Sequence, residues 1–373
     1  MRKIKIMHMA DFHIGLDISF LGNQSRFRKA EVLEGFRKTC SLANENNIDI
    51  ILIAGDFLES STIEPAYIAQ VKSILEKVNA KVFIVAGNHD YISLNSPYMD
   101  EDWPANVHIF KNSWIEKVKL DDLNVDVFGA SFTSTYQRES FLDSHYEIDD
   151  KKINIMVLHG DNTEDSLYNP MGISKIKDSK MRYIALGHIH KKPDLGMIGQ
   201  TYFSYAGSPV GQSFNELGER SVMIIEIDQD HTSLSEMTIN SKAFYREKIN
   251  VSKMTSSKEA YDLIIQLISK KYGNYQDNYY QIILEGEIEE GIYFDFDVIE
   301  QLLGNLRYVK VIDETKVKLN YDRVRKEQSL KGIFVDKMLN LIEDAKYSED
   351  EEKVLIYERA FELGLRALEG YRI

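Results

Sequence analysis

Five short motifs rich in aspartate, asparagine and histidine occur within the first 190 residues of this 373-residue sequence. They combine carboxylates with imidazoles and one amide, a mixture that suits Mn²⁺, Fe²⁺ or Zn²⁺ better than Ca²⁺ or a thiolate-bound ion. Seven such side chains are more than one ion can use. The pattern therefore predicts two ions that share a carboxylate and polarise a phosphoryl group. The predicted metal ligands are Asp11, His13, Asp56, Asn88, His159, His188 and His190.

Each motif directly follows an apolar run of the kind that forms a buried strand. The runs are short, rich in β-branched residues and bounded by Gly, Asp, Asn or His. Ligand sites in an open α/β sheet form at the carboxyl ends of the strands, so we expect the motifs to meet at one edge. Residues i and i+2 share a face of a strand, which would place His188 beside His190. The predicted strands, one of which precedes no motif, are Ile4–Ile6, Ile50–Ala54, Val82–Ala86, Val125–Gly129, Ile153–Leu158 and Tyr183–Leu186.

The spacing of apolar residues predicts how these strands are connected. Residues 27–46 and 64–79 carry apolar residues at helical intervals, which gives a β-α-β-α-β opening. A turn at residues 228–230 separates two alternating runs and predicts an antiparallel hairpin. The pattern then changes to strand, helix, strand, helix, strand, without any of the motifs. We predict a catalytic domain, a small α/β domain and a helical tail, with the divisions 1–240, 241–320 and 321–373.

The tail carries apolar residues at intervals of three and four. Ser348 followed by Glu351 has the spacing of a capping box and predicts that a helix starts at Ser348. The apolar positions would form one stripe on each of two helices, and the stripes could pack on each other, on the rest of the chain, or on a partner's helix. These positions are Phe334, Met338 and Leu341 on the first helix and Val354, Tyr357, Phe361, Leu365 and Leu368 on the second.

The composition is that of a soluble globular protein of more than one domain, with 43% hydrophobic and 28% charged residues. The net charge of −14 argues against a protein that binds nucleic acid with its whole surface. Bound metal ions or a basic partner subunit could offset that charge locally. The single cysteine, Cys40, cannot form an internal disulfide, and we found neither a signal-like segment nor a membrane-spanning run. We therefore expect a cytoplasmic protein with no membrane partner.

These motifs resemble the calcineurin-like metallophosphoesterase superfamily, whose pattern D-x-H, GD, GNH-[DE], H and GH-x-H is complete here over about residues 1–235. The resemblance implies a two-sheet α/β sandwich. It also implies that Asp56 bridges two metals, one bound by Asp11, His13 and His190 and the other by Asn88, His159 and His188. His89 would protonate the leaving oxygen of the substrate while water attacks in line.

Glu59 and Asp90 are two acids near the predicted site. Glu59 stands three residues after Asp56, where related phosphatases carry aspartate and related repair nucleases often histidine. As a carboxylate beside His89 it would orient the imidazole and raise its pKa; alternatively, it is a solvated acid at a helix start. We expect Asp90 to point away from the metals.

The segment Tyr205–Arg220 is similar to a run found in DNA double-strand-break repair exonucleases of the SbcD type. That resemblance implies a DNA nuclease with a small α/β capping domain and a helical tail that binds a coiled-coil, SMC-like ATPase. The sequence has no P-loop motif, so the ATPase would be another chain. Ser208, Lys191, Lys192 and Arg220 could contact a DNA phosphate, and two copies of the chain could pair.

Two other functions fit the same sequence. One is a phosphodiesterase or phosphatase that acts on a small molecule or a phosphoprotein. The other is a scaffold subunit with a vestigial metal site. The histidines outside the motifs are interpreted as ordinary core or surface residues: His8, His108, His145 and His231.

Overall fold

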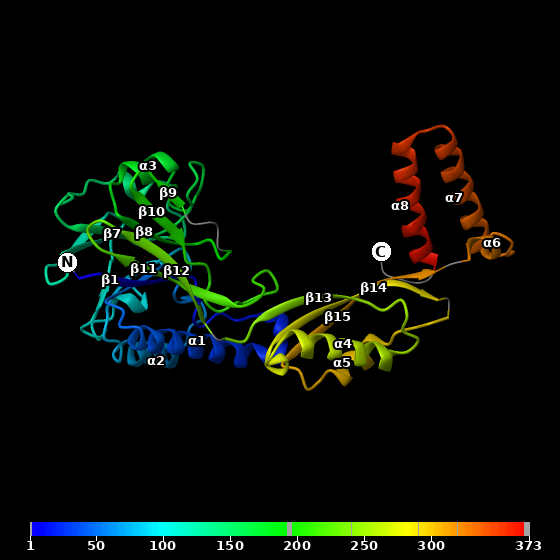
Figure 1. Cartoon of the computed structure of the whole chain (residues 1–373), viewed down its shortest axis with the longest axis horizontal. Coiled ribbons are helices and arrows are strands. Elements are labelled where there is room, and N and C mark those ends of the chain that lie inside the picture. Colours follow the sequence, from blue (N-terminus) through cyan, green and yellow to red (C-terminus); the bar gives the residue numbers. More distant parts are fainter. Residues whose placement is uncertain (1, 192–195, 240, 290, 319, 369–373) are drawn as a thin grey trace. The chain divides into compact units, whose positions relative to one another are not determined.

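The computed structural model in Figure 1 describes residues 2–191, 196–239, 241–289, 291–318 and 320–368. Its first sheet has six strands in the order β12-β11-β1-β2-β3-β4. The last four of these strands are parallel, and β11 and β12 form the expected antiparallel hairpin beside β1. The strands are β1 (Ile4–Met9), β2 (Ile50–Ala54), β3 (Lys81–Val85), β4 (Val107–Ile109), β11 (Arg220–Ile227) and β12 (Thr232–Ile239).

The second sheet also has six strands, in the order β5-β6-β7-β8-β10-β9. Its four central strands are parallel, and the two edge strands run antiparallel to their neighbours. The strands are β5 (Glu116–Leu120), β6 (Val125–Gly129), β7 (Ile153–His159), β8 (Tyr183–Gly187), β9 (Gly196–Ile198) and β10 (Thr201–Tyr205).

The central strands are continuously apolar because both of their faces are buried. In β2, Leu52 packs between the two sheets, against residues of β6 and β7, whereas Ile51 and Ile53 pack on the helical side. Helices α1 (Ser25–Glu45) and α2 (Pro65–Leu75) contribute to that helical side of the first sheet. The second sheet packs its outer face on α3 (Ile173–Asp178) and neighbouring loops. The result is the expected two-sheet α/β sandwich.

A third, three-stranded sheet follows, in the order β13-β14-β15. Its strands are connected through helices, and the backbone bonds from Tyr279 to Ala243 and from Val251 to Glu285 show that β13 and β14 run parallel. This strand-helix-strand-helix-strand order is the one expected from the sequence. The elements are β13 (Phe244–Asn250), α4 (Ser257–Lys271), β14 (Tyr279–Glu289), α5 (Phe296–Leu302) and β15 (Tyr308–Lys318).

The tail contains α6 (Tyr321–Val324), α7 (Leu330–Tyr347) and α8 (Glu351–Leu368). Helices α7 and α8 lie antiparallel, and their apolar stripes pack on each other through Val335, Ile342, Phe361 and Leu365, the first of the three expected arrangements. No described helix is long and apolar enough to cross a membrane.

The predicted start of the last helix at Ser348 is wrong. The Ser348 hydroxyl donates to the carbonyls of Asp344 and Ala345 and so completes the end of α7. Asp350 caps α8 instead, because its carboxylate accepts the backbone N–H of Lys353 at 3.1 Å.

The described chain divides into two compact units. One comprises Met1–Arg246 with Asn274–Gln281 and Gly304–Val309, and the other comprises Glu247–Gly273, Ile282–Leu303 and Lys310–Ile373. The division into three domains at residues 240 and 320 stays a prediction.

Candidate metal centre

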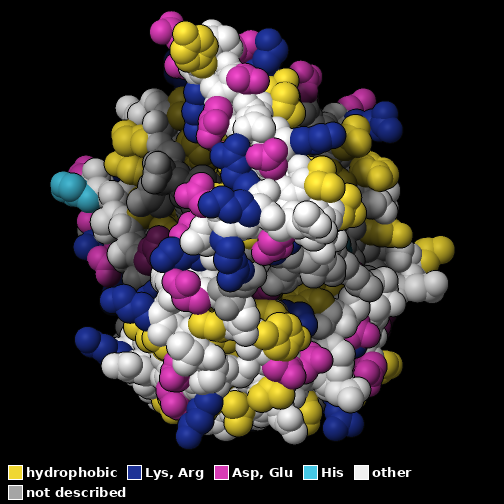
Figure 2. Space-filling view, turned by 90° about the vertical axis from the view of Figure 1, so that its right-hand side faces the viewer, with side chains coloured by type: hydrophobic (Ala, Val, Ile, Leu, Met, Phe, Trp, Pro, Cys, Tyr) yellow, Lys and Arg dark blue, Asp and Glu magenta, His cyan; other side chains and the backbone are white. Residues whose placement is uncertain are grey.

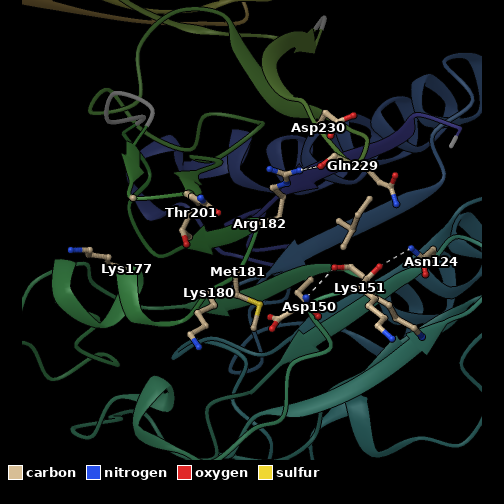
Figure 3. Close-up of a pocket in the computed structure, with 15 residues that line it drawn as sticks. Asn124, Asp150, Lys151, Lys177, Lys180, Met181, Arg182, Thr201, Gln229 and Asp230 are labelled. Atoms are coloured by element: carbon tan, nitrogen blue, oxygen red, sulfur yellow. Dashed lines mark hydrogen bonds between the residues drawn. The ribbon is translucent and has the colours of Figure 1, made fainter.

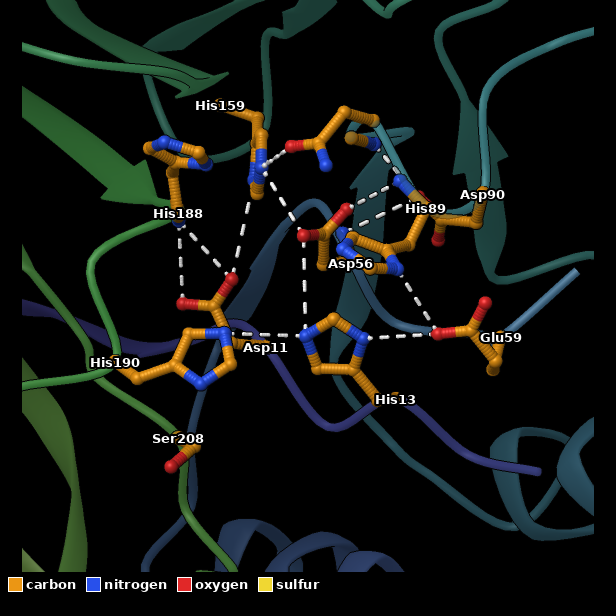
Figure 4. Close-up of polar contacts among 12 residues, drawn as sticks. Asp11, His13, Asp56, Glu59, His89, Asp90, His159, His188, His190 and Ser208 are labelled. Carbon is orange, nitrogen blue, oxygen red and sulfur yellow. Dashed lines mark hydrogen bonds and ion pairs between the residues drawn. The ribbon is translucent and has the colours of Figure 1, made fainter. Parts of the chain in front are cut away.

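The five motifs follow the carboxyl ends of β1, β2, β3, β7 and β8, and their side chains converge (Figure 4). Asp11, His13 and His190 form one group, in which each residue offers a ligand atom within 4.8 Å of the others. The Nε2 atoms of His13 and His190 face each other at 3.1 Å. His13 Nε2 also lies 3.8 Å from Oδ2 of Asp56, which connects this group to its neighbour.

The second group consists of Asp56, His159 and His188, again with ligand atoms within 4.8 Å of one another. Nε2 of His159 lies 3.4 Å from Oδ2 of Asp56 and 3.1 Å from Oδ1 of Asn88. All seven predicted ligands are therefore brought together, with Asp56 between the two groups. The assignment of each ligand to one metal stays a prediction.

The ligand atoms in these groups are oxygen and nitrogen atoms that face each other, an arrangement that fits metal ions. His159 Nδ1 lies 2.9 Å from the carbonyl of Ala54 and donates its proton there, so its Nε2 faces the oxygens of Asp56 and Asn88, where a bound cation would replace the proton that Nε2 carries in the metal-free site. His190 Nδ1 lies 2.7 Å from Glu216 Oε1 and is fixed in the same tautomer. Convergent acceptors repel one another unless a cation lies between them. Two divalent ions would satisfy this arrangement.

The backbone of the site is strained at four of the ligand positions. Asp11, His13, Asp56 and His188 have φ values of 54°, 44°, 46° and 106°, in the left-handed region that non-glycine residues seldom adopt. The Asp11 carboxylate accepts the N–H of His188 at 3.0 Å, and the Asp11 N–H donates to Gly55 at 3.1 Å. Such contacts between neighbouring strand ends hold the strained residues in place.

Asp90 organises this backbone from behind. It is fully buried and, as expected, does not face the metal groups: its carboxylate accepts the N–H groups of Asp56, Phe57, Leu58 and Gly87 and the hydroxyl of Tyr98. Asp90 thus clamps the turn after β2 to the turn after β3. The sequence pattern gave no indication of this role.

His89 lies at the exposed side of the site, beside the buried Glu59. The side chain of His89 is 46% exposed, and its Nδ1 lies 3.0 Å from Oε2 of Glu59. The hydrogen bond to Glu59 raises the pKa of His89 above its ordinary value. The same carboxylate lies 3.4 Å from Nδ1 of His13. Glu59 is buried rather than solvated, and it contacts both a predicted metal ligand and the predicted acid.

Burial and the surrounding imidazoles set the charges of three carboxyl groups. Burial raises the pKa of Asp11. Burial would also raise the pKa of Asp56, but the charge of His159 lowers it overall, so Asp56 is ionised. For Glu59, hydrogen bonds with His13 and His89 outweigh burial and lower the pKa to about 2.

The residues predicted to contact a DNA phosphate are mostly engaged within the protein. Ser208 is fully buried, and its hydroxyl donates to Glu216 at 2.7 Å. The Arg220 guanidinium donates to the carbonyls of Ser208 and His190. The prediction is therefore wrong for Ser208, which is fully buried. For Arg220, which is partly buried and holds the loop that carries Glu216, it stays a prediction. Lys191 is exposed, and Lys192 lies outside the described residues.

A cavity of about 900 Å³ lies at the opposite edge of the sandwich, around the amino ends of β7, β8 and β10 (Figure 3). Lys152 in its lining forms ion pairs with Asp121 and Asp126, and Arg182 donates to the Gln229 carbonyl. Lys177 and Lys180 extend in different directions in Figure 3. The lining therefore lacks the convergent donor set of the metal centre. Its cationic side chains are Lys151, Lys152, Lys177, Lys180 and Arg182.

The four remaining histidines belong to none of the metal-capable groups found among the described residues. His8 is buried and contacts the Tyr183 hydroxyl at 2.7 Å, whereas His145 and His231 are exposed.

Comparison with known proteins identifies the family. The sequence pattern of the calcineurin-like phosphoesterases matches residues 4–192, which include all seven predicted ligands. This chain belongs to the calcineurin-like phosphoesterase family. It is thus a metallophosphoesterase, built around the two carboxylate and imidazole groups described above.

Among curated relatives of this phosphoesterase, the uncharacterized metallophosphoesterase YhaO of Bacillus subtilis is 22% identical over 77% of the chain and 73% of its own length. The DNA double-strand break repair protein Mre11 of Saccharolobus solfataricus is 21% identical over 95% of the chain and 93% of its own length. Mre11 of Archaeoglobus fulgidus is 29% identical over 55% of the chain and 50% of its own length.

Solved structures similar to this phosphoesterase include TT1561 of Thermus thermophilus, with a TM-score of 0.40 and 12% identity, over 64% of this chain and 100% of that one. A dimetal phosphatase from Danio rerio has a TM-score of 0.41 and 8% identity, over 64% of this chain and 99% of that one.

Proposed function

We propose that this phosphoesterase is a DNA nuclease that hydrolyses phosphodiester bonds with two divalent ions, Mn²⁺ in the first place and Fe²⁺ or Zn²⁺ as alternatives. The observation that carries the proposal is the pair of ligand groups that meet at Asp56, with the half-exposed His89 beside them. Bound ions would supply Lewis acidity toward a phosphoryl oxygen and lower the pKa of water.

The residues of the chain have separate roles in this proposal. Asp11, His13, Asp56 and His190 would hold one ion, and Asp56, Asn88, His159 and His188 the other. His89 would hold the proton that the leaving oxygen takes up, and Glu59, 3.0 Å from its Nδ1, would keep the imidazole protonated and oriented. The His89 side chain is 46% exposed, so a substrate from solvent can reach the imidazole.

DNA is favoured over smaller substrates by two observations. Several relatives bear the name Mre11 DNA double-strand break repair protein, and one of them aligns with 95% of this chain. The segment Tyr205–Arg220, by which the sequence resembles SbcD-type exonucleases, lies against His190 in the structure. The resemblance therefore involves residues that contact a predicted metal ligand, which supports the proposal.

A single set of assays tests the proposal. Purified protein with Mn²⁺ would be incubated with linear DNA, a cyclic nucleotide and an aryl phosphate, alongside the Asp56→Ala variant. We expect cleavage of DNA that is lost with Asp56→Ala and in EDTA. Hydrolysis of only the small substrates would instead identify a phosphodiesterase or phosphatase. Equal background rates for both proteins on every substrate would identify a scaffold with a vestigial site.

We also propose that the α7 and α8 pair binds a coiled-coil, SMC-like ATPase. The two helices expose large apolar side chains although their stripes are already packed on each other. Figure 2 shows one face of the molecule, on which hydrophobic side chains are distributed among charged ones. The exposed apolar residues are Leu330, Ile333, Leu341 and Tyr347 on α7 and Leu355, Ile356 and Leu368 on α8.

The ATPase proposal predicts a loss of binding when these side chains become charged. Sedimentation velocity with a purified coiled-coil ATPase of the same source would compare the wild type with Ile333→Glu and Leu355→Glu. Binding that is unchanged in both variants, each folded by circular dichroism, would contradict the proposal. Pairing of two copies of this chain stays a prediction, which the same measurement on the chain alone addresses.

A further inference from the structure

Glu216 is a buried carboxylate that contacts a predicted metal ligand and was not singled out from the sequence. Its Oε1 lies 2.7 Å from Nδ1 of His190. Its Oε2 accepts the hydroxyl of Ser208 at 2.7 Å and the backbone N–H of Gln212 at 2.9 Å. Both carboxylate oxygens are therefore bonded, so the carboxylate has one defined orientation.

The partners of Glu216 are themselves held in place. Arg220 donates to Oγ of Ser208 at 3.0 Å and to the carbonyls of Ser208 and His190 at 2.8 and 2.6 Å. The Gln212 side chain donates to the carbonyl of Phe12 at 2.5 Å, between the ligands Asp11 and His13. The loop thus touches the first ligand group on two sides.

This arrangement fixes one tautomer of His190. A carboxylate accepts a hydrogen bond, so Nδ1 must carry the proton, and Nε2 then presents its lone pair toward His13 and the metal site. A carboxylate behind a ligating histidine also makes the ligand more basic. His13 and His159 have different partners behind them, Glu59 and the Ala54 carbonyl. Loss of Glu216 should therefore weaken one metal position and spare the other.

We propose that Glu216 is a positioning residue that holds His190 as a metal ligand, and that the loop from Ser208 to Arg220 is a wall of the metal centre. The proposal rests on the two-metal site of the proposed function but not on DNA as the substrate. It assigns a role to the loop that differs from the DNA phosphate contact expected from the sequence.

The test is the affinity of the metal-free protein for Mn²⁺, measured by calorimetry and by electron paramagnetic resonance of the free ion. We expect wild type to bind two ions, and Glu216→Gln to bind one of them about 10–100-fold more weakly while the other is unchanged. The matched control is Glu219→Gln, an exposed residue on the same loop with the same charge change, which should bind like wild type. Wild-type affinity at both positions in Glu216→Gln would overturn the proposal.

Three further variants separate positioning from general loss of structure. Ser208→Ala removes one hydrogen bond to Glu216 and should weaken the same metal position by less. Glu216→Asp keeps the carboxylate and should restore part of the affinity. In a His190→Ala background, Glu216→Gln should add no further loss, because the histidine on which it acts is absent.

Ser208→Ala and Glu216→Asp keep the test decisive even if Glu216→Gln does not fold. Losses in Glu216→Gln and His190→Ala that simply add together would overturn the proposal, as would wild-type affinity in Ser208→Ala. Metal binding is measured without DNA, so a chain that binds two ions but cleaves no DNA would contradict the proposed nuclease and leave the role of Glu216 standing.

Discussion

His89 is the predicted acid of the site, and together with His13 and Glu59 it also forms a third metal-capable group. Its Nδ1 is bonded to Glu59, and its backbone N–H donates to Oδ1 of Asp56 at 2.9 Å. The imidazole is more exposed than those of His13 and His159, which are almost completely buried. A side chain that is tethered at one nitrogen and exposed to solvent is suited to proton transfer.

Replacing His89 with asparagine should therefore slow turnover without removing metal. We expect kcat to fall by about 10²- to 10⁴-fold, the usual contribution of a general acid, with two ions still bound. Steady-state kinetics and metal analysis on the same preparation measure both effects. His145→Asn is the control, because that histidine is exposed and distant in sequence from every motif. Loss of metal from His89→Asn would mean that His89 is a ligand and not the acid.

The sequence alone predicted which side chains converge better than it predicted the residues that support them. Predicted ligands such as His188 and His190 directly follow apolar runs, and strand alternation explains their spacing. The carboxylate of Glu216 bonds a histidine 26 residues earlier in the chain, and no local pattern encodes that distance. Ser208 was expected at a phosphate because hydroxyls on loops are usually accessible, whereas here it is fully buried.

Helix α1 carries an ion cluster around Arg28 and Glu31. The Arg28 side chain is completely buried and pairs with Glu31 at 3.0 Å. Glu31 also accepts the hydroxyl of Tyr279 at 2.7 Å and pairs with Lys242 at 2.9 Å and Arg307 at 2.6 Å. Burial would raise the pKa of Glu31, but these partners lower it below its ordinary value of 4.5.

Glu31→Gln should destabilise the protein at neutral pH, since it leaves Arg28 buried without its carboxylate. The expected loss is about 3 kcal/mol at pH 7. The lowered pKa means that Glu31 stabilises the fold fully above pH 4.5 and loses that effect as the pH falls through the folded-state pKa. The difference from wild type should shrink below pH 4.5, as measured by urea unfolding at several pH values.

The matched control for Glu31→Gln is Glu34→Gln, which lies one turn further along α1. Glu34 pairs with Arg37, and both side chains are about half exposed. This change should alter the free energy of unfolding by less than about 0.5 kcal/mol. If both variants lost the same stability at every pH, the buried cluster would not be the cause.

Gly332 lies at the start of α7 where no side chain fits. A Cβ there would lie 2.3 Å from the carbonyl oxygen of Glu327 and 2.7 Å from that of Val324. Gly332→Ala should therefore displace the connection from α6 and destabilise it by about 1–3 kcal/mol, despite the better helix propensity of alanine. Amide hydrogen exchange in α7 would show the effect as faster exchange.

Gly273→Ala provides the control for Gly332→Ala. The position has no atom within 4 Å of an added Cβ and no positive φ, so the change should be neutral or slightly stabilising. Equal exchange in α7 for both variants would contradict the steric explanation.

The elements with strong local patterns were predictable, and the weakly patterned ones were not. The strands β2 and β6 have the bounds expected from their apolar runs. The strand β4 has three residues and no buried position, and β5 is mostly only partly buried, so neither shows an apolar run. The start of α8 was wrongly predicted at Ser348 because the Ser348 hydroxyl bonds the preceding helix, and Glu349 has a left-handed backbone between the two helices.

The whole molecule carries a net charge of −14, which opposes association with DNA. If DNA is the substrate, bound ions must supply much of the attraction. We expect the slow His89→Asn variant to bind DNA with a Kd above about 10⁻⁶ M in EDTA and with a lower Kd in Mn²⁺. Fluorescence anisotropy at about 150 mM salt measures both values.

Asp56→Ala should lose this Mn²⁺ effect, because it lacks the carboxylate between the two ligand groups. DNA binding that is equally tight in EDTA and in Mn²⁺ would indicate a basic surface on the chain that acts independently of the metals.

The left-handed backbone at Asp11, His13, Asp56 and His188 has a consequence for laboratory evolution of this protein. Glycine adopts such conformations freely, so replacing one of these residues with glycine would relieve strain while removing the chemistry. A library screened only for resistance to heat should accumulate glycine at these positions and lose turnover. Screens for robust variants must therefore score catalysis in the same round.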